Sequence, residues 1–105
     1  MNYRVEFAPR ARCDIENCID YFTNFSEDFA VTQIERLYDV IANSIAQTPT
    51  TWNHFFLTGA PYRAYLFRVG RRTQFWIVYT VDEQTKVVNV LRFWNASRDT
   101  ENFRI

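Results

Sequence analysis

Residues 62–94, YRAYLFRVGRRTQFWIVYTVDEQTKVVNVLRFW, contain three apolar and aromatic runs that are separated by two short polar turns. Gly70 marks the first turn, and the polar residues 82–84 mark the second. Strands that are joined by such short turns pair as antiparallel neighbours. The stretch therefore predicts a three-stranded antiparallel meander. Its strands are expected at residues 62–69, 73–81 and 85–94.

The N-terminal residues predict a further strand. Residues 2–8 alternate in the manner of a half-buried strand, with Tyr3, Val5 and Phe7 on one face. Because two helical segments separate this strand from the meander, it can pair beside one of the later strands.

Two amphipathic helices are predicted between the first strand and the meander. Pro9 suits the first turn of a helix that continues to about residue 24. Ser26 is the expected N-cap of a second helix, which ends before Pro49. The apolar stripes of the two helices are Ala11, Ile15, Cys18, Ile19 and Phe22, and Ala30, Ile34, Leu37, Ile41 and Ile45.

The element order is therefore β-α-α-β-β-β. It indicates an α+β fold in which a helical hairpin packs on one face of the sheet. Residues 48–61 form the only substantial irregular segment, and we expect Trp52, Phe55 and Phe56 to hold it against the core. Without repeats, linkers or low-complexity segments, residues 1–105 are expected to form a single domain.

Two assignments are open for the faces of the last strand. Val88, Val90 and Trp94 share one face with Arg92, whereas Val87, Leu91 and Phe93 share the other with Asn89. We favour the second set as the core-facing one, which places Arg92 on the face opposite the helices.

Charge is divided unevenly along a chain whose formal net charge is zero. Residues 1–61 carry four basic and eight acidic side chains, or −4, whereas residues 62–105 carry eight basic and four acidic ones, or +4. The arginine-rich C-terminal half therefore predicts a face that attracts phosphates or carboxylates. The neutral total argues against a strong non-specific nucleic-acid binder.

The cysteine and histidine content predicts neither a disulfide nor a metal site. Cys13 and Cys18 lie five residues apart in a predicted helix, so their side chains should point in different directions. Together with the single His54 they give no zinc pattern, and no cofactor is expected. The chain shows no signal peptide and no apolar run long enough to span a membrane, which indicates a cytoplasmic protein.

Three stretches in this order resemble the RelE/ParE superfamily of bacterial toxins from type II toxin–antitoxin modules, also known as plasmid-stabilisation proteins. YRVEFAPRARCDIENCIDYF, at residues 3–22, is similar to the first strand and helix of that family. PYRAYLFRVGRRTQFWIVYTVD, at residues 61–82, is similar to its central hairpin. VVNVLRFWNASRD, at residues 87–99, is similar to its last strand and Arg-Asp ending.

The resemblance implies a growth inhibitor that a cognate antitoxin neutralises. RelE-like members cleave mRNA on the ribosome, whereas ParE-like members inhibit DNA gyrase without nuclease chemistry. Antitoxins of the family wrap the toxin with a helix and an extended segment, and they commonly cover the helical hairpin, the sheet edge and the basic face. The charge division predicts an acidic antitoxin segment over the C-terminal half.

A RelE-like ribonuclease needs an acid, a base and a cation for the developing phosphorane charge. Arg68, Arg92 and Arg98 are the candidate catalytic cations, but arginine stays protonated and is a poor base. The loop before the central strands contains no lysine, and Phe103 stands where the family has a tyrosine. These departures weaken the ribonuclease hypothesis.

Other groups for proton transfer are no better supported by the sequence. Tyr65 and Tyr79 keep their hydroxyls, but they lie inside predicted strands, where we expect them to be packed. His54 and Glu101 are alternatives that nothing in the sequence favours.

A ParE-like toxin needs only a surface that binds a large partner, with arginine and aromatic anchors. The candidate target-binding residues are Arg71, Arg72, Trp94, Arg98 and Phe103. The ending at residues 96–99, ASRD, is also nearer the ParE-like pattern. We therefore favour a non-enzymatic gyrase inhibitor; the alternatives are a ribosome-dependent mRNA endoribonuclease and a non-toxic, antitoxin-binding relative.

Overall fold

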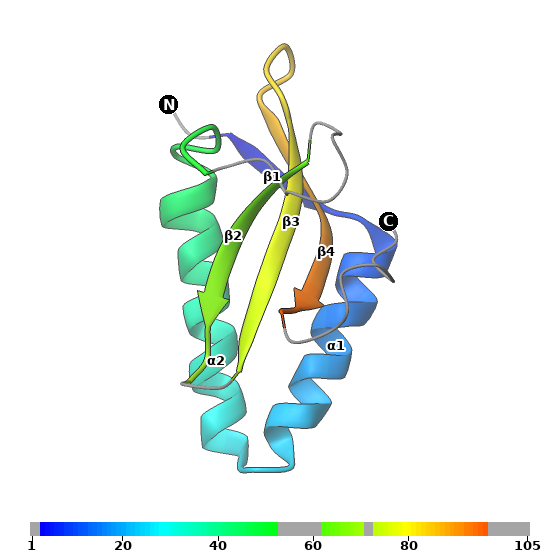
Figure 1. Ribbon diagram of the computed structural model, residues 1–105, viewed down its shortest axis with the longest axis vertical. Helices are drawn as coiled ribbons and strands as arrows, with labels where there is room; N and C mark the ends of the chain where they lie inside the picture. The colour runs from blue at the N-terminus through cyan, green and yellow to red at the C-terminus, as the bar shows by residue number, and fades with distance from the viewer. Residues whose placement is uncertain (1–2, 53–61, 71–72, 97–105) are drawn as a thin grey trace.

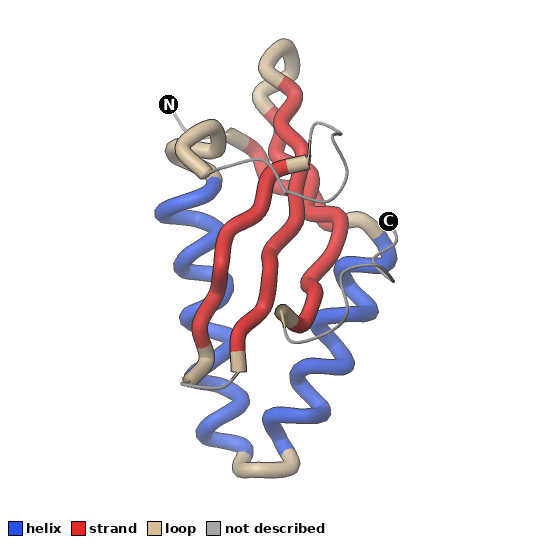
Figure 2. Tube along the Cα trace, viewed as in Figure 1, coloured by secondary structure: helices blue, strands red, loops and turns tan. Residues whose placement is uncertain are grey.

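The computed structural model describes residues 3–52, 62–70 and 73–96. The elements follow in the predicted order, and Figures 1 and 2 show a helical hairpin packed against one sheet. They are β1 (Arg4–Phe7), α1 (Pro9–Thr23), α2 (Glu27–Val40), a π-helical turn η1 (Ile41–Ile45), β2 (Arg63–Arg68), β3 (Gln74–Asp82) and β4 (Val87–Asn95).

The sheet has the strand order β1-β4-β3-β2. The last three strands form the predicted antiparallel meander. β1 joins it as a parallel neighbour of β4, from the pair Arg4 and Val87 to the pair Phe7 and Val90. The predicted α+β fold is therefore confirmed, and the N-terminal strand lies beside the last one.

Local signals in the sequence account for both helices. Pro9 lies in the first turn of α1, and Phe29 N–H donates to the Ser26 Oγ at 2.9 Å to cap α2. The predicted apolar stripes face the sheet, where they form the main core with the inner residues of β3 and β4. In that core Phe22 of α1 meets Phe75 of β3 edge to face, with ring centroids 6.1 Å apart.

A β-bulge decides which side chains of β4 face the helices. Val78 pairs with Arg92, but Tyr79 pairs with Val90, so Leu91 is an extra residue in β4. The bulge reverses the alternation, so that Val88, Val90 and Phe93 all lie in the main core. The prediction that Val87 and Leu91 share the core face with Phe93 is therefore wrong, because it assumed an uninterrupted strand.

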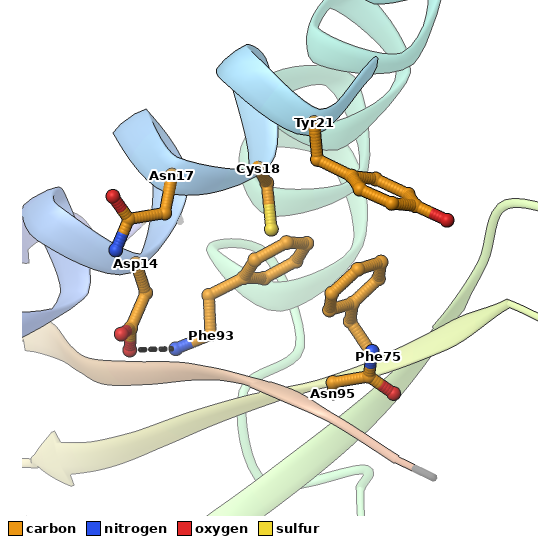
Figure 3. Close-up of a pocket in the computed structure, with 7 residues that line it drawn as sticks. All are labelled: Asp14, Asn17, Cys18, Tyr21, Phe75, Phe93 and Asn95. Carbon is orange, nitrogen blue, oxygen red and sulfur yellow. Dashed lines mark hydrogen bonds between the residues drawn. The ribbon is translucent and has the colours of Figure 1, made fainter. Parts of the chain in front are cut away.

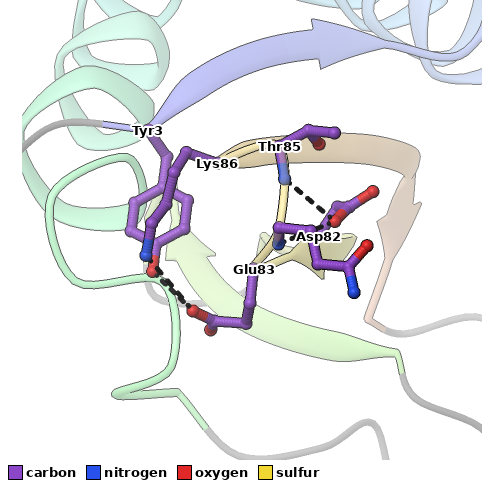
Figure 4. A network of polar contacts seen from close by, with 6 residues as sticks. Tyr3, Asp82, Glu83, Thr85 and Lys86 are labelled. Carbon is purple, nitrogen blue, oxygen red and sulfur yellow. Dashed lines mark hydrogen bonds and ion pairs between the residues drawn. The ribbon is translucent and has the colours of Figure 1, made fainter.

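The turn between β3 and β4 is held by side chains (Figure 4). The Asp82 carboxylate accepts hydrogen bonds from Gln84 N–H at 3.0 Å and Thr85 N–H at 3.2 Å. Lys86 takes a left-handed conformation with φ of 56°. The Tyr3 hydroxyl donates to Glu83 Oε2 at 2.9 Å, which ties the turn to the N-terminal segment.

We expect the stability given by Asp82 to depend on pH. The backbone N–H and the side chain of Thr85 hold the pKa of Asp82 below its usual value. A carboxyl with a lowered pKa in the folded state stabilises the fold above its unfolded pKa of about 3.9, and this contribution is lost as the pH falls through its folded pKa. Asp82→Ala should therefore lower the free energy of urea unfolding at pH 7, and the difference from wild type should shrink in acid.

The matched control is Asp20→Ala, which removes an exposed carboxylate from α1. A difference between Asp82→Ala and wild type that stays constant from neutral to acidic pH would contradict the prediction.

Candidate functional site

A buried ion pair joins the last strand to the first helix. The Arg92 Nε of β4 donates to Asp14 Oδ2 of α1 at 2.7 Å, and its Nη2 donates to Asp14 Oδ1 at 3.1 Å. The side chains are only 8% and 16% exposed, respectively. Such a two-bond, partly desolvated pair fixes both groups in position.

Asp14 also binds the backbone of β4. β1 ends opposite Val90, so among the described residues no strand pairs with that edge of β4 beyond this point. Phe93 N–H, on the open edge, donates to Asp14 Oδ2 at 3.0 Å. The carboxylate therefore accepts the bond that a carbonyl of a longer β1 would accept, and it orients Arg92 at the same time.

The predicted target-binding residue Trp94 lies on the other face of the sheet. Its ring is 5.0 Å from the Arg92 guanidinium carbon, and it packs in a second apolar cluster with Ala64 and Val78. Trp94 is 6% exposed. Contact of this indole with a target would therefore require the cluster to open.

The structure does not bring the candidate catalytic arginines Arg68 and Arg92 together. Arg68 is exposed at the end of β2, and β3 lies between β2 and β4. The Arg68 carbonyl accepts a bond from Arg36 Nη2 at 2.9 Å, which holds the end of β2 against α2. The other predicted site residues, Arg71, Arg72, Arg98 and Phe103, lie outside the described residues, as do His54, Phe55, Phe56 and Glu101.

The two tyrosines of the central strands are packed, as predicted. The Tyr79 hydroxyl is buried and donates to the Pro49 carbonyl at 2.6 Å, and burial raises its pKa further above the usual range. Tyr65 is half-buried against Trp52, with ring centroids 4.6 Å apart. A Tyr79 hydroxyl committed to a backbone carbonyl is poorly placed to donate or accept a catalytic proton.

The cysteines form no disulfide and belong to no candidate metal-binding cluster in the described part of the chain. Both are free thiols, and no cluster of three or more metal-ligating side chains occurs there. Burial, and to a lesser extent the charge of Asp14, raises the pKa of Cys18 to about 12. The Cys18 thiol therefore stays protonated and is a weak nucleophile. None of the described helices has the length and apolar character needed to cross a membrane.

A cavity of about 350 Å³ adjoins the Asp14–Phe93 contact, between α1, the start of β3 and the end of β4 (Figure 3). Sequence reasoning did not indicate this cavity, since its walls come from separate segments. Its lining residues are Asp14, Asn17, Cys18, Tyr21, Phe75, Phe93 and Asn95.

A largely apolar groove of about 470 Å³ follows the seam between α1 and α2. We call it the hairpin groove; it is lined by Ile19, Thr23, Glu27, Ala30, Val31, Ile34 and Glu35. Val31 is 56% exposed, although it is apolar. A second hollow of about 360 Å³ shares Ile19 and continues the groove towards Tyr38. Exposed apolar surface with charged rims is typical of a protein-binding site.

The chain that carries these features matches a known protein family. Residues 5–100 match the family described as the ParE toxin of the type II toxin–antitoxin system, parDE. The chain therefore belongs to the ParE toxin family, the toxin components of type II toxin–antitoxin systems. A search of curated proteins gave no match to the sequence.

Solved structures of toxin–antitoxin complexes share the fold. The RelBE2 complex from Mycobacterium tuberculosis superposes with a TM-score of 0.59 at 14% identity, covering 90% of this chain and 99% of that one. The chromosomal ParDE system from P. aeruginosa gives 0.57 at 14% identity, with 89% and 95% covered. The archaeal RelE–RelB complex from Pyrococcus horikoshii gives 0.50 at 16% identity, with 94% and 100% covered.

We expect the Asp14–Arg92 pair to be coupled in stability. Asp14→Ala removes the carboxylate that binds the buried Arg92 guanidinium and accepts the Phe93 N–H bond, and should lower the free energy of unfolding by about 3 kcal/mol. The double variant Asp14→Leu with Arg92→Met removes both charges. Its loss in free energy of unfolding should be smaller than the sum of the losses of the two single variants. Urea unfolding of wild type, Asp14→Leu, Arg92→Met and the double variant measures this coupling.

Asp20→Ala is the control on the same helix and should change the free energy of unfolding by no more than about 0.5 kcal/mol. Additive effects of Asp14→Leu and Arg92→Met would show that the pair does not act as a unit.

Proposed function

We propose that this protein inhibits bacterial growth by binding and blocking DNA gyrase, without catalysing a reaction. The observation that carries the proposal is the burial of Arg92 against Asp14, because the ribonuclease hypothesis uses Arg92 as a phosphate contact. Tyr79 is likewise bonded to a backbone carbonyl. The match to the ParE family supports the same choice.

The proposed target also sets the location and the binding surface. Gyrase acts on DNA in the bacterial cytoplasm, so we place the toxin there. The basic C-terminal half supplies the contacts, and its proposed anchors are Arg71, Arg72, Trp94, Arg98 and Phe103. In this role the module would serve plasmid stabilisation, as the resemblance implies.

The test is expression of the chain alone, which should stop growth. The purified protein should then inhibit gyrase-dependent supercoiling while the mRNA ends on ribosomes stay unchanged. Arg98→Ala should raise the inducer concentration needed to stop growth by about tenfold or more. An arginine anchor contributes about 1.4 kcal/mol or more to binding, which corresponds to a tenfold change in affinity. Arg12→Ala, on the exposed side of α1, is the control.

Two results would overturn the proposal. New mRNA ends on ribosomes with normal supercoiling would favour the RelE-like endoribonuclease, in which Arg68 and Arg98 remain candidate catalytic cations. Normal growth at high expression would favour a non-toxic, antitoxin-binding protein.

We propose that the cognate antitoxin places a helix in the hairpin groove. The lining of the groove is largely apolar, and it includes the exposed carboxylates of Glu27 and Glu35. An amphipathic helix with an apolar face and basic flanks matches this surface. The acidic antitoxin segment expected over the C-terminal half would then be a separate part of the same partner.

Val31→Asp should weaken antitoxin binding by roughly tenfold or more, because it buries a new carboxylate in an apolar contact beside two glutamates. Since Val31 is exposed, the fold should tolerate the change. Calorimetric titration with the protein encoded by the adjacent reading frame measures the affinity. Thr32→Asp introduces the same charge one residue along, outside the groove lining, and should bind as wild type does. Equal affinities of both variants would contradict the proposed position.

A further inference from the structure

Arg36 of α2 contacts the last two residues of β2. Its Nη2 donates to the Arg68 carbonyl at 2.9 Å, and its guanidinium carbon lies 5.1 Å from the centroid of the Phe67 ring. Phe67 is buried and belongs to the main core. The guanidinium therefore binds both a backbone group and an aromatic face at the end of the strand, which lies beside α2 in Figure 1.

Arg36 is also fixed within its own helix. Its Nη1 donates to the side-chain Oε1 of Gln33, three residues earlier in α2. Gln33 is polar but only 6% exposed, so the acceptor is held in place by the packing around it. A planar guanidinium that binds two oxygens and rests on a ring has little orientational freedom left. The side chain is therefore a preorganised link between α2 and the end of β2.

The strand end that is bound in this way is the base of the β2–β3 turn. Val69 N–H donates to the Thr73 carbonyl at 2.9 Å, and Gly70 N–H donates to the same oxygen at 3.2 Å. Arg71 and Arg72, two of the proposed gyrase anchors, follow Gly70 directly in the chain. The guanidinium contact is therefore made immediately before the residues on which the proposed target binding depends.

We propose that Arg36 is a positioning residue for gyrase binding, which acts by fixing the base of the β2–β3 turn. It does not contact the target. An anchor contributes most to affinity when the chain that carries it is ordered before binding, because less conformational entropy is then lost in the complex. The inference rests on the proposed gyrase inhibition, and it assigns a role in that activity to a residue of the acidic N-terminal half.

NMR relaxation of the ¹⁵N-labelled protein tests the effect on the turn without gyrase. Arg36→Met keeps an apolar stem against the Phe67 ring but removes both hydrogen bonds. We expect the heteronuclear NOE of the Val69 and Gly70 amides to fall in this variant, while the amides of β4 keep their wild-type values. Unchanged values at Val69 and Gly70 would overturn the proposal, because the base of the turn would then be ordered without Arg36.

Inhibition of gyrase-dependent supercoiling tests the consequence for binding. Arg36→Met should raise the concentration needed for half-inhibition roughly fivefold, since the turn must then be ordered during binding. Arg36→Lys should also be weaker than wild type, because an ammonium group lacks the planar fork that binds two oxygens and stacks on a ring. The matched control is Arg12→Met, which removes the same charge from an exposed position of α1 and should inhibit as wild type does.

A double variant separates positioning from direct contact. The fold-changes of Arg36→Met and Arg71→Ala should combine to less than their product, because both act through the same turn. A full product, or wild-type inhibition by Arg36→Lys, would indicate that Arg36 meets gyrase as a charge and would overturn the positioning role.

The same assay distinguishes this inference from the proposed function. If wild type inhibits gyrase and Arg36→Met inhibits equally well, the positioning role alone is wrong. If wild type does not inhibit gyrase, the proposed function is wrong, and the role of Arg36 in gyrase binding is overturned with it.

Discussion

The carboxylate of Asp14 is the contact on which this sheet depends. β1 is short and pairs with only the first part of β4, so the rest of that edge needs another acceptor. Asp14 accepts the Phe93 N–H and binds Arg92 with both oxygens. One side chain of α1 thereby completes the sheet edge, neutralises a buried cation and fixes the distance between helix and sheet. Apolar packing between α1 and β4 is non-directional, so this carboxylate supplies a directional contact between them.

The fold could be predicted because its signals are local. Alternation in residues 2–8 and the apolar, aromatic character of the three later runs indicated the strands. Helical spacing indicated the apolar stripes, and short turns fixed the antiparallel order. The bulge at Leu91 could not be predicted in this way. It arises from the pairing of β3 with β4, and nothing in the residues 87–95 taken alone marks the position at which the alternation reverses. The error over Val87 and Leu91 follows from that single inserted residue.

The candidate site was less accessible to sequence reasoning, and Arg92 shows why. An arginine within an aromatic strand can be a positioned anion contact or one half of an internal ion pair. Its partner Asp14 lies 78 residues earlier in the chain. In the sequence, Asp14 has the spacing of a solvated acid beside the apolar stripe of α1. Local patterns in the sequence do not show which long-range pair forms. The roles of Arg71, Arg72, Arg98 and Phe103 stay predictions because the structure does not describe those residues.

The uneven division of charge along the chain affects how an antitoxin would neutralise the toxin. The acidic residues concentrate in the part of the chain that forms α1 and α2, and the basic residues concentrate in the part that forms the meander. The groove and the arginines belong to different segments of the chain, and we propose that a partner in the groove leaves the arginines uncovered. An antitoxin that holds to the groove alone would therefore leave the proposed target surface open. Neutralisation requires a second, oppositely charged segment, and a partner with both segments gains the added affinity that linked binding events provide.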